Sequence, residues 1–86
     1  MTYDQLLTLE AIVQEGSFKA ASHVLFKTQP SLSMAIKKLE NEIGFTLFNR
    51  DTYRPTLTEK GQRFYEKSQH ALASMRALDV LSLIHI

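Results

Sequence analysis

The residues with the clearest capacity for chemistry are the polar side chains at the start of one segment, Thr-Gln-Pro-Ser-Leu-Ser-Met from position 28. A Gln amide can pair with the N6 and N7 edge of adenine, and a Ser hydroxyl can hydrogen-bond several base edges. Pro and Met can make apolar contact with the methyl group of a thymine. The candidates for contacts with bases are therefore Gln29, Pro30, Ser31, Ser33 and Met34.

A helix over residues 28–43 is needed to present these side chains together, and the spacing of its apolar residues predicts one. Thr28 can cap it, and Pro30 falls in the first turn, where its missing N–H costs no helical hydrogen bond. Gly44 supplies a stop. The inward stripe at i, i+4, i+7 and i+11 consists of Leu32, Ile36, Leu39 and Ile43.

The opposite face of this helix is polar at its start and basic further along. It carries Pro30, Met34, Lys37 and Asn41, with Ser33 and Lys38 on its flanks. The major groove of B-DNA is about 12 Å wide and admits such a helix. Lys37 and Lys38 would then neutralise flanking phosphates, with Thr28 near the backbone at the helix start. The alternative is that Gln29, Ser31 and Ser33 only form a capping turn on a solvated face. We interpret Glu40 and Glu42 as solvated acids on an exposed side of the helix rather than as an acid–base pair.

Two shorter helical patterns precede this segment. Thr2 and Gln5 read as a capping box, apolar residues follow at helical spacing, and Gly16 ends the pattern. Ser17 caps the next segment, which ends near Leu25. Only residues 26 and 27 separate it from Thr28, so the two helices form a helix-turn-helix unit.

After Gly44 the period changes to that of strands. Residues 45–48 and 56–58 are expected to form short strands around a polar turn, and such a ribbon after a helix pair is a wing. Tyr53 and Arg54 at the wing can reach the DNA backbone or the minor groove. The alternative for Tyr53 is a solvent-facing turn residue.

A last helix is predicted from Glu59, capped by Thr58, to about Leu81. It is longer than a core of this size needs, so part of its apolar face should stay exposed or meet a partner. Residues 82–86 are not expected to continue the helix. We interpret them as a tail that is foreign to the domain or truncated.

Composition excludes several other classes of protein. The 86 residues allow one domain, and 44% apolar content argues against disorder. With no cysteine and with His23, His70 and His85 far apart, we expect no disulfide, no metal site and no cofactor. No catalytic motif, signal peptide or membrane span is evident, so we expect a cytoplasmic protein that is not an enzyme.

Charge favours nucleic acid through its distribution rather than its sum. The net charge is only +1, but residues 19–38 hold four lysines and no acid: Lys19, Lys27, Lys37 and Lys38. Phosphate binding depends on the local field, so such a patch matters more than the total. The two lysines near the second helix would touch phosphate at most.

The chain also resembles a known family, the N-terminal domain of LysR-type transcriptional regulators, from about Leu6 to Gly61. The similar residues are Gly16-Ser17-Phe18, Ala20-Ala21, Gln29-Pro30-Ser31-Leu32-Ser33, Ile36, Leu39-Glu40, Ile43-Gly44, Leu47-Phe48-Asn49-Arg50 and Leu57-Thr58-Glu59-Lys60-Gly61. Two positions depart from the family pattern: Met34 stands where Arg is frequent, and Thr28 where Ser is common.

The resemblance implies a mainly α fold: a winged helix-turn-helix of three helices and a small β-wing, followed by a long C-terminal dimerisation helix. It also implies that Arg50 and Arg54 contact the DNA backbone or the minor groove. The expected dimerisation residues are Phe64, Ala71, Met75 and Leu78. The parent protein would bind a small-molecule effector through a further C-terminal domain, and it could form a tetramer.

We therefore expect a winged helix-turn-helix at residues 1–58, a linker and dimerisation helix at 59–81, and the tail at 82–86. The predicted function is sequence-specific binding of double-stranded DNA by a homodimeric transcription factor, with the helix 28–43 in the major groove and the 49–56 wing at the backbone or minor groove. The rival hypothesis is a winged helix used for protein interaction or dimerisation. That function would require an apolar outward face with aromatic anchors.

Overall fold

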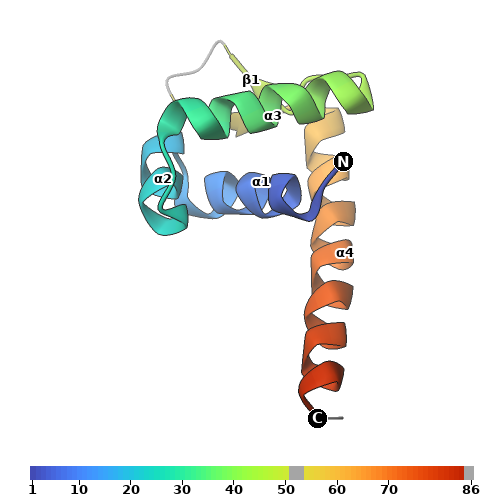
Figure 1. Ribbon diagram of the computed structural model, residues 1–86. Coiled ribbons are helices and arrows are strands. Elements are labelled where there is room, and N and C mark those ends of the chain that lie inside the picture. The colour runs from blue at the N-terminus through green and yellow to red at the C-terminus, as the bar shows by residue number, and fades with distance from the viewer. Residues whose placement is uncertain (51–53, 85–86) are drawn as a thin grey trace.

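The computed structural model describes residues 1–50 and 54–84, and those ranges form four helices and one two-stranded sheet (Figure 1). The elements are α1 (Tyr3–Glu15), α2 (Phe18–Leu25), α3 (Gln29–Ile43), β1 (Phe48–Asn49), β2 (Thr56–Leu57) and α4 (Glu59–Ile84). The predicted fold class, a mainly α winged helix-turn-helix with a long C-terminal helix, is confirmed.

Helix starts and ends follow local side-chain chemistry, as the sequence predicts. The Thr2 hydroxyl accepts from the Gln5 N–H at 3.1 Å, and the Gln5 side chain accepts from the Thr2 N–H at 2.8 Å, which completes the capping box. Ser17 caps α2 through the Ala20 N–H at 3.0 Å. Gly16 and Gly44 end α1 and α3 in the left-handed conformation, which L-residues rarely adopt.

The turn between α2 and α3 ends on an unusual residue. Phe26 is the C-cap of α2 at φ 55°, the one described residue other than glycine with positive φ. Its ring is 95% exposed, so no packing offsets the backbone strain. Lys27, next in the chain, reaches Asp4 of α1 with Nζ–O distances of 2.8 and 2.9 Å.

The core lies where α1, α2 and α3 face each other and continues under the wing. The apolar stripe of α3 is buried as predicted, with Leu32, Ile36 and Leu39 almost inaccessible and Ile43 partly buried against the same cluster. Fully buried Ala21 offers little bulk, so α2 can lie close to its neighbours. The ring of Phe18 meets that of Phe48 edge-on at 5.8 Å between centroids, which ties the wing to α2.

The β-ribbon is shorter than predicted. It is antiparallel, with Phe48 opposite Leu57 and Asn49 opposite Thr56, and the expected strand residues 45–47 are not part of it. The reason is that Leu47 donates its N–H to the Glu40 carboxylate at 2.6 Å instead of to a neighbouring strand. Thr58 also leaves the strand, because its hydroxyl caps α4 through the Gly61 N–H at 2.9 Å.

The long helix α4 runs across the ends of α1 and α3 and extends well beyond them (Figure 1). Leu72 is fully buried, and Arg76 forms an ion pair with Glu10 of α1 at 2.7 Å, which raises the pKa of Arg76. The helix continues to Ile84, so the prediction that it stops at about Leu81 is wrong for residues 82–84, while residues 85 and 86 lie outside the described residues. Residues 81–84 contain no Gly or Pro that would stop it. No helix in the described ranges is long and apolar enough to cross a membrane.

Candidate nucleic-acid interface

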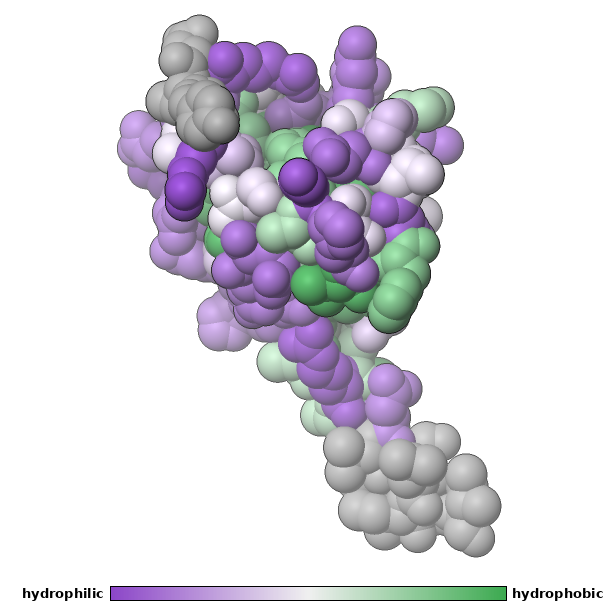
Figure 2. Space-filling model, turned by 90° about the vertical axis from the view of Figure 1, so that its left-hand side faces the viewer, coloured by the Kyte–Doolittle hydropathy of each residue, from purple (hydrophilic) through white to green (hydrophobic). Residues whose placement is uncertain are grey.

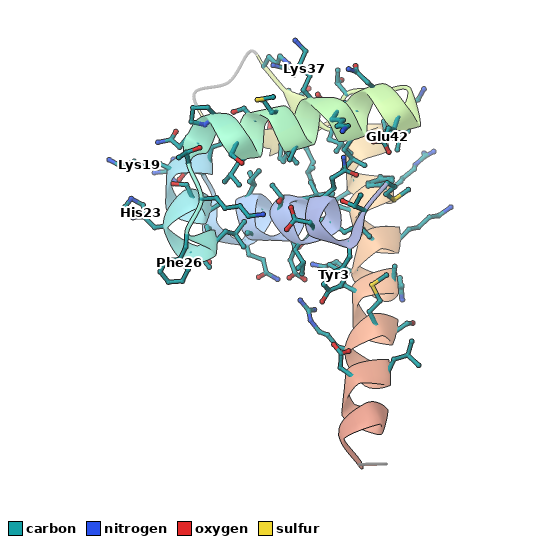
Figure 3. The ribbon with its side chains drawn as sticks, in the orientation of Figure 1. Tyr3, Lys19, His23, Phe26, Lys37 and Glu42 are labelled. Carbon is teal, nitrogen blue, oxygen red and sulfur yellow. The ribbon has the colours of Figure 1, made fainter. Side chains whose placement is uncertain are left out.

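The outer face of α3 is open to solvent over its whole length. Every candidate for a base contact is exposed: Gln29, Pro30, Ser31, Ser33 and Met34. Met34 is 73% exposed, and Lys37 points away from the three-helix body in Figure 3. The wing lies on the same side of the molecule as this face, and the far end of α4 lies on the opposite side (Figure 1).

The first turn of α3 is fixed by its cap. The Thr28 hydroxyl accepts the Ser31 N–H at 3.3 Å, and Pro30 has no N–H to offer. The hydroxyl proton of Thr28 is still available to a phosphate oxygen. The N–H groups of Thr28 and Gln29 are used by neither the helical hydrogen bonds nor the cap. The helix start therefore contributes fewer backbone donors than an uncapped helix would.

One hollow of about 590 Å³ brings together residues that are far apart in the chain. It lies between the start of α2, the start of α3 and the base of the wing, and it is lined by Glu15, Gly16, Ser17, Phe18, Lys19, Gln29, Arg54 and Pro55. Gln29 and Arg54, predicted separately as a base reader and a wing contact, thus share one surface. Lys19 joins them and points outward in Figure 3. From the sequence alone, Lys19 was expected to touch phosphate at most.

A second hollow of about 430 Å³ lies between the C-terminal half of α3 and the other side of the wing. It is lined by Lys37, Glu40, Asn41, Gly44, Phe45, Thr46 and Arg50. The Arg50 guanidinium donates to Glu40 Oε1 at 3.1 Å. Glu40 is 6% exposed, so its interpretation as a solvated residue is wrong. A signal for its burial was present, since Glu40 lies four and eight residues after Ile36 and Leu32 of the buried stripe.

The other residues that were predicted to contact phosphate or to act from the wing differ in exposure and in their partners. Lys38 and Arg54 are exposed, while Tyr53 lies outside the described residues. Lys27 is engaged by Asp4, so it contributes less to the basic patch than the sequence suggests. Glu42, close to Lys38 on α3, accepts hydrogen bonds from the N-terminal amino group and from Gln5, and these hold its pKa below the ordinary value.

The predicted dimerisation residues divide into two sets. Phe64 packs against the chain's own core and meets Phe45 edge-on at 6.2 Å between ring centroids. Ala71, Met75 and Leu78 are exposed further along α4, with Leu78 at 65%. Met75 and Leu78 line a hollow of about 260 Å³ together with Tyr3 and Asp79.

The distribution of exposed apolar residues bears on the rival hypothesis of a protein-binding face. The side of the molecule that α2 forms is mostly hydrophilic, with a hydrophobic patch on its lower part (Figure 2). The exposed aromatic residues in the described ranges, Tyr3 and Phe26, lie away from α3 (Figure 3). The outer face of α3 has Met34 as its one exposed large apolar residue among those described. It therefore lacks the aromatic anchors of a protein-binding face.

Comparison with known proteins identifies the family to which this geometry corresponds. The model of the family described as bacterial regulatory helix-turn-helix protein, lysR family, matches residues 3–62. A probable RuBisCO transcriptional regulator from Porphyra purpurea is 42% identical over 84 residues, which is 93% of this chain and 26% of that protein. The chain thus spans about a quarter of the length of this relative.

Solved structures agree with the family match. The DNA-binding domain of BenM, in its complex with benA site 1 DNA, superposes with a TM-score of 0.91 at 30% identity, covering 95% of this chain and 92% of that one. A full-length OxyR variant from Pseudomonas aeruginosa superposes with a TM-score of 0.92, also at 30% identity, covering 98% of this chain and 28% of that one.

Proposed function

Because the chain belongs to the lysR family of bacterial regulatory helix-turn-helix proteins, we propose that it reads a specific sequence of double-stranded DNA as a homodimer and thereby regulates transcription. The chain is a LysR-type helix-turn-helix DNA-binding domain, given the family match and the similarity to a domain solved on DNA. The observation that carries the proposal is the exposed polar face of α3 beside the wing.

In this proposal α3 enters the major groove and its first two turns read bases. Gln29 pairs with an adenine edge, and the hydroxyls of Ser31 and Ser33 bond base edges within their reach. Pro30 and Met34 contact thymine methyl groups. All five side chains are exposed while the opposite face of α3 is buried, so base contacts cost no rearrangement of the core.

Phosphate contacts supply most of the affinity, and they come from both ends of the exposed face. Lys37 and Lys38 lie beyond the base-reading turns, and the Thr28 hydroxyl lies at their start. Arg50 and Arg54, with Tyr53, act from the wing at the backbone or the minor groove. Gln29 at the start of α3 and Arg54 in the wing line one hollow, which supports this division of roles between base and backbone contacts. A DNA strand that contacts the start of α3 there would also contact the wing.

Dimerisation is assigned to the exposed part of α4. Ala71, Met75 and Leu78 are exposed on α4, and Tyr3 of α1 lines the same hollow as Met75 and Leu78. Phe64 supports the dimer only indirectly, because it is packed in the chain's own core. A two-fold pair of such helices presents two recognition helices to successive major grooves, which favours a site with approximate inverted symmetry.

The chain spans about a quarter of the length of its relative from Porphyra purpurea. We propose that a further C-terminal domain binds a small-molecule effector and that full-length subunits can form tetramers. The function of the chain itself is tested by fluorescence anisotropy of a labelled duplex, with the stoichiometry measured by sedimentation. Two chains per duplex support the proposal. A chain that dimerises without binding DNA at low salt would favour the protein-interaction hypothesis instead.

A further inference from the structure

The turn from α3 into the wing is organised by one buried carboxylate. Glu40 Oε2 accepts the Leu47 N–H at 2.6 Å, and Oε1 accepts from Arg50 Nη2 at 3.1 Å. The two oxygens therefore join three parts of the chain: α3, the turn that follows it and the wing residue directly after β1. A buried carboxylate needs such partners, because burial without them is costly.

The partner guanidinium is placed very differently. The Arg50 side chain is 70% exposed, and Glu40 engages one of its nitrogens while the group faces the second hollow. A guanidinium has five N–H donors in a planar fork, so most of them remain for another acceptor. Lys37, Asn41 and Thr46 line the same hollow. Their ammonium, amide and hydroxyl groups can all donate to an anionic oxygen.

We propose that this hollow binds a backbone phosphate of the DNA, and that Glu40 is the positioning residue that holds Arg50 for it. The inference rests on the proposed function and names a residue that acts through another. Glu40 also lines this hollow, but its side chain is 6% exposed and that of Arg50 is 70% exposed, so a phosphate there meets mainly the guanidinium. Holding the long Arg50 side chain in place before binding lowers the entropy cost of the phosphate contact.

The charge of Glu40 provides a sharp test, because simple electrostatics predicts the opposite result. Removing a negative charge should strengthen binding to a polyanion. Glu40→Gln keeps an oxygen for the Leu47 N–H but offers an amide, which cannot hold Arg50 by charge. We therefore expect the variant to bind more weakly, about tenfold on a short duplex of mixed sequence, in keeping with the loss of one charge-assisted hydrogen bond.

The matched control is Glu42→Gln, which makes the same charge change two residues away on the exposed side of α3. It should bind as tightly as the parent chain or more tightly. Arg50→Gln should lose as much affinity as Glu40→Gln, and the double variant should lose no more than either. The salt dependence of log K should fall by about one unit in all three variants that disturb the pair.

The outcomes separate the possible failures. The positioning role is overturned, while DNA binding stands, if Glu40→Gln binds DNA as tightly as Glu42→Gln does. It is also overturned if the double variant loses affinity by the product of the losses in Glu40→Gln and Arg50→Gln. If the parent chain binds no DNA, the proposed function falls together with this inference. Should Glu40→Gln lose its helical circular dichroism, Arg50→Lys decides. Lys keeps the charge but lacks the planar fork that directs separate N–H groups at Glu40 and at a phosphate. The inference therefore predicts a loss close to that of Arg50→Gln, and affinity equal to the parent chain contradicts it.

Discussion

Gly61 in the first turn of α4 lies directly against the carbonyl group of Leu47, and a Cβ on Gly61 would stand 2.3 Å from that oxygen. The same oxygen accepts the Thr58 N–H at 2.9 Å. The turn that follows α3 and the first turn of α4 are thus tightly packed against each other. This contact fixes the place from which α4 leaves the body.

Gly61→Ala should destabilise the fold by about 1–3 kcal/mol, because the added methyl group must displace a backbone carbonyl. In an exposed helix the same change would stabilise the fold by about 1 kcal/mol. The sign of the change in the free energy of unfolding therefore distinguishes the two cases. Urea unfolding followed by circular dichroism measures the free energy of unfolding. Gln62→Ala at the exposed neighbouring position serves as the control and should stay within about 0.5 kcal/mol of the parent chain. A stabilised Gly61→Ala chain would contradict the packing described here.

Gln29→Ala should cost about 1–3 kcal/mol on preferred DNA sites and relax the preference at one base pair. The side chain is exposed, so the substitution should change the free energy of unfolding only slightly, as surface substitutions do. Anisotropy titrations on the preferred duplex and on a scrambled duplex measure both effects. Equal losses on the two duplexes would remove Gln29 from the set of base readers.

Arg54→Ala should weaken binding to specific and random DNA by similar factors and lower the salt slope by about one unit. The reason is that a wing cation at the backbone or minor groove contributes mainly to charge neutralisation. The measurement is a titration on both duplexes over a series of salt concentrations. A loss confined to the preferred site would instead make Arg54 a base-specific contact.

Met34→Arg places a cation where the resemblance to the LysR-type family indicates that Arg is frequent. Because Met34 is 73% exposed on the outer face of α3, the change should leave stability within about 0.5 kcal/mol. It should tighten DNA binding and raise the salt slope by about one unit. Met34→Gln, of similar size and uncharged, is the control. A Met34→Arg chain with an unchanged slope would place position 34 away from the DNA.

Leu78→Asp tests the assignment of the dimer to α4. A carboxylate in an apolar helix pair should weaken self-association by about tenfold or more, at the level of an interface residue worth over 1 kcal/mol. Sedimentation measures the monomer–dimer equilibrium, and the folded monomer should keep its helical circular dichroism. Ala73→Asp changes an exposed residue on a different side of α4 and should have little effect. Equal dimerisation in both variants would mean that another surface pairs the subunits.

The features that sequence could predict are those that depend on neighbours along the chain. Caps at Thr2, Ser17, Thr28 and Thr58 and stops at Gly16 and Gly44 are local hydrogen-bonding or backbone effects, and the structure confirms each one. The buried stripe of α3 is likewise periodic. These signals were sufficient for the order and type of every element.

The features that sequence missed depend on contacts between distant segments. Glu40 falls at the spacing of the buried stripe, but periodicity does not reveal the partners that its buried carboxylate needs, which are the Leu47 N–H and Arg50. Lys27 is removed from the basic patch by Asp4, 23 positions earlier. On α4, Leu72 is fully buried one turn before Arg76, which pairs with Glu10 of α1, while the neighbouring Ala71 is exposed.

Sequence-specific DNA binding by a pair of α3 helices is tested by selection from a pool of random duplexes, with the bound fraction sequenced at two salt concentrations. We expect enrichment of an inverted repeat with half-sites about one helical turn apart, bound with an affinity that falls steeply as salt rises. Salt-sensitive binding without any enriched sequence would contradict base reading by α3. The absence of binding even at low salt would contradict the DNA-binding function as a whole.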